Sequence, residues 1–183
     1  MVTSILFGII VLITLWAVFA YNRFVALGNR ASEALSDIEV QEKRRYDLIP
    51  NLVSTVKGYA AHESQAFEKV TAARSAAMQA GTLPDKAKAE NVLTGALKSL
   101  FAVAEAYPEL KANQNFLALQ EELSDTENKI QAARRFYNTT VRDLDTNIDS
   151  FPGNILASLF KFEKRDYFEL EGGDAKNPVE VNF

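Results

Sequence analysis

The chain of 183 residues contains no cysteine and a single histidine, His62. Without cysteine it can form no disulfide, no thiol nucleophile and no thiolate metal site. A di-metal centre in a helical bundle needs paired Glu-x-x-His turns, and the residue three before His62 is Tyr59. The HExxH zinc motif also requires a second histidine. We therefore expect no catalytic, cofactor-binding or metal-binding residues, and no cofactor.

The chain has no surplus of basic residues. Its 20 Lys and Arg side chains are outnumbered by 24 Asp and Glu side chains, which gives a formal net charge of −4. A nucleic-acid-binding domain usually gathers basic residues on one face and interleaves them with aromatic side chains. No such cluster occurs along the chain. We therefore expect no nucleic-acid partner.

One long apolar run lies near the N-terminus. Residues 5–21 (ILFGIIVLITLWAVFAY) carry no charge, and Arg23 is the first side chain that must stay in water. As a helix, residues 2–21 would extend about 30 Å, which is enough to cross a bilayer. We therefore expect a transmembrane anchor over residues 1–22, with the lipid bilayer as its partner. Its lipid-facing and interfacial side chains are predicted to be Ile5, Leu6, Ile9, Leu12, Leu15, Trp16, Phe19 and Tyr21.

A cleaved signal peptide is the alternative reading of this run, because Val18-Phe19-Ala20 places small residues where a signal peptidase needs them. However, no Lys or Arg precedes the run, and the run is longer than a usual signal-peptide core. We therefore expect an uncleaved, single-pass anchor. Since Arg23 and Arg30 follow it closely, the positive-inside rule favours an N-terminus outside and the rest of the chain in the cytoplasm.

Beyond the anchor, apolar residues recur at helical spacing nearly throughout. A stripe from Leu27 to Ala73 is followed by stripes over residues 92–107 and 116–148, and Gly and Pro residues separate them. The chain shows no βα alternation and no repeat of fixed period. Helices of this length bury their stripes only by packing together. The predicted fold is therefore all-α, with three or four helices packed into an antiparallel bundle or coiled coil over residues 23–150.

The pattern changes after Phe151-Pro152-Gly153. Residues 155–160 form a short apolar turn, and a polar, Gly-containing tail follows. Val179–Phe183 alternate like a short strand or an extended clip. We therefore expect residues 151–183 to form a short helix and an extended tail.

The stretch KRRYDLIPNLV, residues 43–53, places charges and a proline within a helical stripe. The stripe keeps its phase through Pro50. Proline nevertheless removes the hydrogen bond to the Tyr46 carbonyl and costs about 3 kcal/mol unless the helix bends or restarts. We therefore expect a kink or break near Pro50, and interpret the stretch as a junction between two helices rather than a catalytic site. The predicted junction residues are Arg44, Arg45, Asp47 and Pro50.

Three charged residues fall on the phase of apolar stripes, namely Arg45, Glu127 and Arg134. An unpaired charge on such a face is costly, so each must find a partner or reach water. We expect Arg45 or Arg44 to reach a carboxylate on the last long helix, with Glu127 as the first candidate. Such pairs fix helix register more than they add stability. The alternative is that these charges occupy solvated rim positions.

Several segments resemble the LemA family of bacterial membrane proteins, in the family's order and spacing between Tyr21 and Phe168. They are KRRYDLIPNLVSTVKGYAAHE, EAYPELKANQNFLALQEEL, TENKIQAARRFYN and the FP at residues 151–152. Leu144-Asp145 departs from the family, which tends to place an aromatic residue followed by Asn at that point. The resemblance implies a single N-terminal anchor in the bacterial inner membrane, followed by an antiparallel four-helix bundle.

The resemblance also implies a role in membrane organisation, because a relative in magnetotactic bacteria takes part in forming magnetosome membranes. No enzymatic activity is established for the family. We therefore expect a non-enzymatic, membrane-anchored scaffold that acts as a homo-oligomer. A second hypothesis is an adaptor or regulator of another membrane protein, such as a membrane protease. A third and weaker hypothesis is a hydrolase centred on His62.

Overall fold

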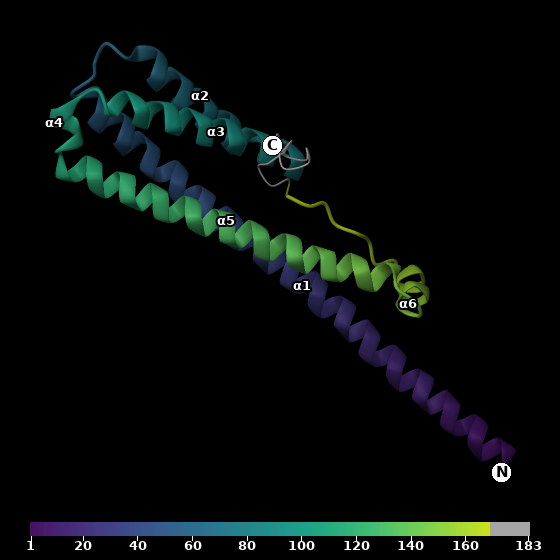
Figure 1. Cartoon of the computed structure of the whole chain (residues 1–183). Coiled ribbons are helices and arrows are strands. Elements are labelled where there is room, and N and C mark those ends of the chain that lie inside the picture. Colours follow the sequence, from purple (N-terminus) through teal and green to yellow (C-terminus); the bar gives the residue numbers. More distant parts are fainter. Residues whose placement is uncertain (169–183) are drawn as a thin grey trace, which may run out of the picture. The chain divides into compact units, whose positions relative to one another are not determined.

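The computed structural model describes residues 1–168 and contains six helices and no strand in that range. The helices are α1 (Val2–Lys57), α2 (Ser64–Gln79), α3 (Leu83–Ala104), α4 (Pro108–Lys111), α5 (Gln114–Asp149) and α6 (Gly153–Phe160) (Figure 1). The predicted all-α class is confirmed, and so is a short helix near residues 155–160. The extended segment predicted at Val179–Phe183 lies outside the described residues.

Local capping signals explain where two of the long helices begin. The Thr82 hydroxyl accepts a hydrogen bond from the Asp85 amide at 3.3 Å, and Pro84 occupies the first turn of α3, where no N–H is needed. At the start of α5, Oδ1 of Asn113 accepts a hydrogen bond from the Phe116 amide at 3.0 Å. Both caps pair amides that the helix itself leaves without partners.

Helix α1 does not restart at Pro50, which was one of the two outcomes predicted there. It continues through the proline to Lys57 as one helix of 56 residues. The junction with α2 lies instead at residues 58–63, so the predicted break near Pro50 is wrong. The alternative, one long helix kinked near Pro50, stays a prediction. Pro50 is exposed while its neighbours Ile49 and Leu52 are buried. Burying two such side chains yields about 1.5–3 kcal/mol each, which offsets a penalty of about 3 kcal/mol for the proline.

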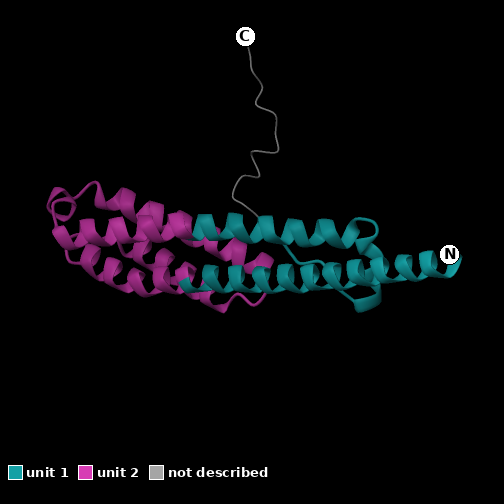
Figure 2. Ribbon diagram, turned by 90° about the horizontal axis from the view of Figure 1, so that it is seen from below, with its two compact units in different colours: residues 1–40, 130–167 teal, residues 41–129, 168–183 magenta. Residues whose placement is uncertain are grey.

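The described residues form two compact units, shown in different colours in Figure 2. Unit 2 consists of residues 41–129 and Phe168, and contains the end of α1, the whole of α2, α3 and α4, and the beginning of α5. Its four longer helical segments run alternately up and down, and α2 packs along α3 (Figure 1). Its apolar core includes Ile49, Leu52, Val56, Phe67, Val70, Leu93, Leu97, Leu100, Leu110, Phe116 and Leu123.

Unit 1 consists of residues 1–40 and 130–167. Within it, the first part of α1 and the second part of α5 run antiparallel, and α6 follows the end of α5 (Figure 2). A cluster at this end of the unit packs Phe24 against Leu144, Leu156 and Ala157. Phe24 also stacks on Phe162, with ring centroids 4.9 Å apart. Helix α6 is thereby held against α1 and α5.

The segment after α6 returns along the two long helices of unit 1. The Arg165 guanidinium donates a hydrogen bond to the Ser32 hydroxyl on α1 at 3.0 Å. The Tyr137 hydroxyl on α5 donates to the Asp166 carbonyl, also at 3.0 Å. Burial raises the pKa of Tyr137, which keeps the phenol protonated and able to donate this bond. The segment therefore joins α1 and α5 by polar contacts.

The apolar beginning of α1 is not buried by the described part of the chain. No residue before Phe24 is buried, although this part of α1 is apolar and long enough to cross a membrane. The core helix of a soluble protein with so apolar a sequence would be mostly buried. The exposed apolar side chains include all those predicted to face lipid, namely Ile5, Leu6, Ile9, Leu12, Leu15, Trp16, Phe19 and Tyr21. This surface matches a bilayer rather than water.

Gly153 begins α6 at a point of close approach to α5. A Cβ atom at this position would lie 2.6 Å from the carbonyl oxygen of Asn147 and 3.5 Å from Cζ of Phe24. The Asn147 oxygen belongs to the backbone of α5, so it cannot move away by a change of side-chain rotamer. Only glycine therefore allows α6 to start where it does.

We expect Gly153→Ala to lower the midpoint of thermal unfolding, with a cost of about 1–3 kcal/mol from overpacking. Gly28→Ala is the matched control in α1 of the same unit, because nothing lies within 4 Å of a Cβ added there. Alanine in a helix interior is favoured over glycine by roughly 0.5–1 kcal/mol, so the control should be neutral or stabilising. Far-UV circular dichroism of the full chain in mild detergent measures both. Equal midpoints for the two variants would contradict the close approach.

Candidate functional site: a buried polar cluster

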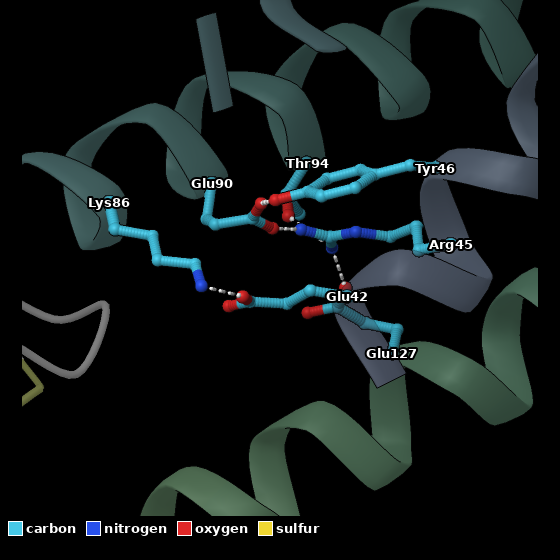
Figure 3. Close-up of polar contacts among 7 residues, drawn as sticks. All are labelled: Glu42, Arg45, Tyr46, Lys86, Glu90, Thr94 and Glu127. Carbon is cyan, nitrogen blue, oxygen red and sulfur yellow. Dashed lines mark hydrogen bonds and ion pairs between the residues drawn. The ribbon is translucent and has the colours of Figure 1, made fainter. Parts of the chain in front are cut away.

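A group of seven polar side chains lies inside unit 2, where α1 faces α3 and α5 (Figure 3). Three of them, Glu42, Arg45 and Tyr46, are spaced three and four residues apart and so share one face of α1. All three are buried. We call this group the buried polar cluster; its members are Glu42, Arg45, Tyr46, Lys86, Glu90, Thr94 and Glu127.

Arg45 is the centre of the buried polar cluster. Its guanidinium forms ion pairs with Glu90 on α3 and Glu127 on α5, and donates a hydrogen bond to the Thr94 hydroxyl at 3.2 Å. The arginine side chain is 1% exposed. Arginine suits this position because its planar guanidinium offers donors in several directions and keeps its charge when buried. One side chain thus connects three helices.

Glu90 receives two kinds of partner in the same cluster. Besides the ion pair with Arg45, it accepts a hydrogen bond from the Tyr46 hydroxyl, and its side chain is fully buried. A buried carboxylate is tolerated only when it is paired and hydrogen-bonded. The Tyr46 hydroxyl adds a hydrogen bond without adding a charge, so both partners of Glu90 come from α1.

A second ion pair adjoins the first. Glu42 is fully buried on α1 and pairs with the Lys86 ammonium on α3 at 3.0 Å. Two cations thus face three carboxylates in the buried polar cluster. The third carboxylate, Glu127, is 29% exposed. A groove of about 270 Å³ opens beside Glu127, and it is lined by Arg45, Glu127 and residues of α3 and α5. Glu127 is therefore accessible to water, whereas Glu90 is fully buried.

The neighbouring arginines of KRRYDLIPNLV have different environments. Arg44 pairs with Glu122 at 2.9 Å on the surface, with both side chains about half exposed. Asp47 and Pro50 are exposed as well. Of the predicted junction residues, only Arg45 therefore lies in the interior, and its contact with Glu127 is the pairing favoured from the sequence. Arg134, the third charge predicted on an apolar stripe, is buried in unit 1.

Two acidic members of the cluster, Glu42 and Glu90, were missed from the sequence. Glu42 follows Ile38 by four residues, and Glu90 precedes Leu93 by three, so both lie on apolar stripes. That phase was the available signal. Charge alone does not distinguish such residues from the solvated ones, because most charged residues in any chain are exposed.

Pro50 leaves the Tyr46 carbonyl without its usual helical donor, and α2 supplies another. Nε of Arg74 donates a hydrogen bond to this carbonyl at 2.8 Å. A proline within a helix normally leaves one acceptor unpaired, because it has no amide hydrogen. Here the acceptor becomes a contact between α1 and α2. Arg74 was not predicted, since nothing in the sequence relates residues 46 and 74.

His62 lies outside this cluster. It is exposed in the turn between α1 and α2. The adjacent Glu63 accepts a hydrogen bond from the Tyr107 hydroxyl at 3.5 Å. Within residues 1–168, no group of three or more His, Cys, Asp and Glu side chains is arranged to hold a metal ion. What the cluster does chemically is hold charges fixed between helices.

The model of the LemA family matches residues 34–183 of the chain. This match includes all of unit 2 and the part of α5 and α6 that belongs to unit 1. It covers most of the chain, and it includes every residue of the buried polar cluster.

Individual relatives also match the chain, and one of them extends the similarity into the N-terminal segment. Magnetosome protein MamQ 2 of Paramagnetospirillum magneticum is 27% identical over 95% of this chain and 73% of its own length. Magnetosome protein MamQ of Magnetospirillum gryphiswaldense is 26% identical over 84% of this chain and 66% of its own. Protein LemA of Metamycoplasma hominis is 30% identical over 74% of this chain and 63% of its own. Together with the exposed apolar segment of α1, these similarities indicate a membrane-associated helical protein.

We expect Arg45→Met to destabilise unit 2 by about 3–5 kcal/mol, because it leaves the Glu90 carboxylate buried without its cation. Arg44→Met is the matched control on the same helix, and losing its exposed pair should cost less than about 1 kcal/mol. The double variant Arg45→Met, Glu90→Met should recover most of the loss, since no fully buried carboxylate then lacks its cation and Glu127 is partly exposed to water. Thermal unfolding by circular dichroism measures all three. The cluster would have no structural role if Arg45→Met unfolded at the same temperature as Arg44→Met.

We expect Arg74→Met to cost about 1–3 kcal/mol, because the Tyr46 carbonyl loses its donor. In a Pro50→Ala background the loss should be smaller, since the alanine amide can donate to the same carbonyl within α1. A double-mutant cycle of unfolding midpoints measures this coupling. Additive effects of the two substitutions would show that Arg74 does not substitute for the missing amide.

Proposed function

Since the chain belongs to the LemA family, we propose that it is a non-enzymatic, membrane-anchored scaffold that assembles with copies of itself to organise or remodel a membrane region. The observation that carries this proposal is the continuity of α1. The helix passes from its exposed apolar segment into the packed part of unit 1 at Phe24 without a linker. A scaffold has to hold its domain in a defined relation to the bilayer, and an unbroken helix does so.

The use of charge in unit 2 supports a structural role. The buried carboxylates Glu42 and Glu90 each face a cation, and both pairs connect α1 with α3. A catalytic carboxylate has to be accessible to a substrate. The relatives named as magnetosome proteins also support a role at membranes.

For the topology, we place the anchor in the bacterial inner membrane, with the N-terminus outside and the packed helices in the cytoplasm. Arg23 and Arg30 follow the apolar segment, and both are exposed. The exposed Lys161 at the end of α6 adds another basic residue near the same end of unit 1. Basic residues close to the end of a span favour the cytoplasmic side.

The absence of cysteine allows a direct test of self-assembly. Single cysteines at Val40, Val92 and Phe136 lie on exposed positions of α1, α3 and α5. Disulfide crosslinking in native membranes should give adducts at multiples of the chain mass, with a yield that depends on position. The cysteine-free parent is the control.

Three other outcomes would contradict the scaffold. Similar low yields at all positions would indicate random collision of monomers. A defined adduct with a foreign protein would support an adaptor or regulator of another membrane protein. A hydrolytic activity lost in His62→Ala would support the hydrolase.

A further inference from the structure

Helix α6 buries one face and leaves the other apolar and exposed. Leu156 and Ala157 pack into the cluster around Phe24. Ile155 and Leu159 lie on the other side of the helix and are exposed, Leu159 at 70%. Phe151, in the turn before α6, is 80% exposed, and Phe160 at the end of α6 is exposed as well. We call these four exposed apolar residues, Phe151, Ile155, Leu159 and Phe160, the α6 patch.

The α6 patch lies beside the last turns of the apolar segment of α1. The turn at residues 150–153 and α1 residues Trp16, Phe19 and Arg23 line one common pocket. The Tyr21 ring packs edge-to-face on Phe160, with centroids 4.9 Å apart. From Trp16 to Phe24 a helix rises roughly 12 Å, so the turn lies alongside the anchor rather than beyond its end.

The position of the α6 patch beside α1 determines whether lipid or water surrounds it. If residues 2–21 cross the hydrocarbon core, Trp16 and Phe19 lie within it or at its boundary. A turn packed against them must lie at the same depth. Exposed side chains as apolar as Phe151 and Leu159 are then in contact with lipid, not water.

The polar residues around the patch fit the boundary of the bilayer. Asn154 and Ser158 are exposed on α6, and Lys161 ends it in the left-handed conformation. Arg23 lies on α1 at the same end of unit 1. A short helix with an apolar face, polar flanks and adjacent basic residues is typical of an element that lies in the membrane interface. Its eight residues would span only about 12 Å and cannot cross the bilayer.

We propose that the α5–α6 turn and α6 form a second membrane contact, which lies in the interface beside the anchor with the α6 patch in the acyl chains. Lipid is the occupant because the patch continues the exposed apolar surface of α1. The inference rests on the membrane anchoring in the proposed function. A second contact would restrict the rotation and tilt of unit 1 relative to the bilayer more than the anchor alone does.

The single tryptophan of the chain, Trp16, makes a fluorescence test possible. In a Trp16→Phe background, Phe151→Trp and Leu159→Trp place the probe in the patch. Phe136→Trp is the matched control, because Phe136 is 53% exposed on α5 of the same unit but about four helical turns from Phe151. The full-length variants are reconstituted in phosphatidylcholine–phosphatidylglycerol vesicles whose acyl chains carry bromine. Circular dichroism verifies that each is folded.

Bromine should quench the probes at 151 and 159 roughly threefold more than the probe at 136, because only a side chain among the acyl chains meets the quencher. Acrylamide in the water should quench in the opposite order. If the patch probes behave like the control while Trp16 of the parent is quenched by bromine, the second contact is overturned and the anchor stands.

Two further outcomes also overturn the proposal. Patch probes shielded from both quenchers would mean that protein, such as a second copy of the chain, covers the patch instead of lipid. A parent Trp16 that bromine does not quench would refute the anchor itself, and with it both the second contact and the proposed scaffold.

Discussion

Unit 2 depends on how one buried charge is compensated. The buried Arg45 guanidinium is no longer hydrated, and the lost hydration free energy is offset by its contacts with Glu90, Glu127 and Thr94, which come from α3 and α5. Because these partners come from separate helices, we expect this compensation to depend on the register of the three helices. Apolar stripes made largely of Leu, Val and Ala tolerate sliding by comparison, because neighbouring apolar side chains are nearly interchangeable partners. The charge therefore gives the unit specificity, while the apolar core supplies most of the stabilisation.

A hydrogen bond from another helix also explains how α1 passes through a proline. Pro50 has no amide hydrogen to donate to the Tyr46 carbonyl, and Arg74 from α2 donates to it instead. Tyr46 thus contacts α2 through its backbone and Glu90 on α3 through its hydroxyl. What looks from the sequence like the end of a helix is a point where three helices are joined. The packing of Ile49 and Leu52 on either side holds the helix continuous.

Unit 1 differs from unit 2 because it exposes many apolar side chains at one end. None of its first 23 residues is fully buried among the described residues, and α6 adds exposed apolar side chains next to them. Gly153 permits this arrangement, since any side chain at the start of α6 would collide with the backbone of α5. The exposed apolar side chains lie at one end of unit 1 only, so they suit an environment that is apolar on one side and aqueous on the other. The boundary of a bilayer meets that description.

The sequence by itself determined the all-α class and the apolar N-terminal segment, and it named Arg45 with Glu127 as a candidate pair, because helical periodicity is local and the phase of a stripe marks its inward residues. Only the tertiary structure decided that α1 runs through Pro50, that Glu90 and Arg74 are partners of α1, and that α6 lies beside the apolar segment of α1. Each of these depends on groups from separate helices meeting at one point. The cost of a proline or of a buried carboxylate can be estimated locally, but the partner that offsets it belongs to another part of the chain.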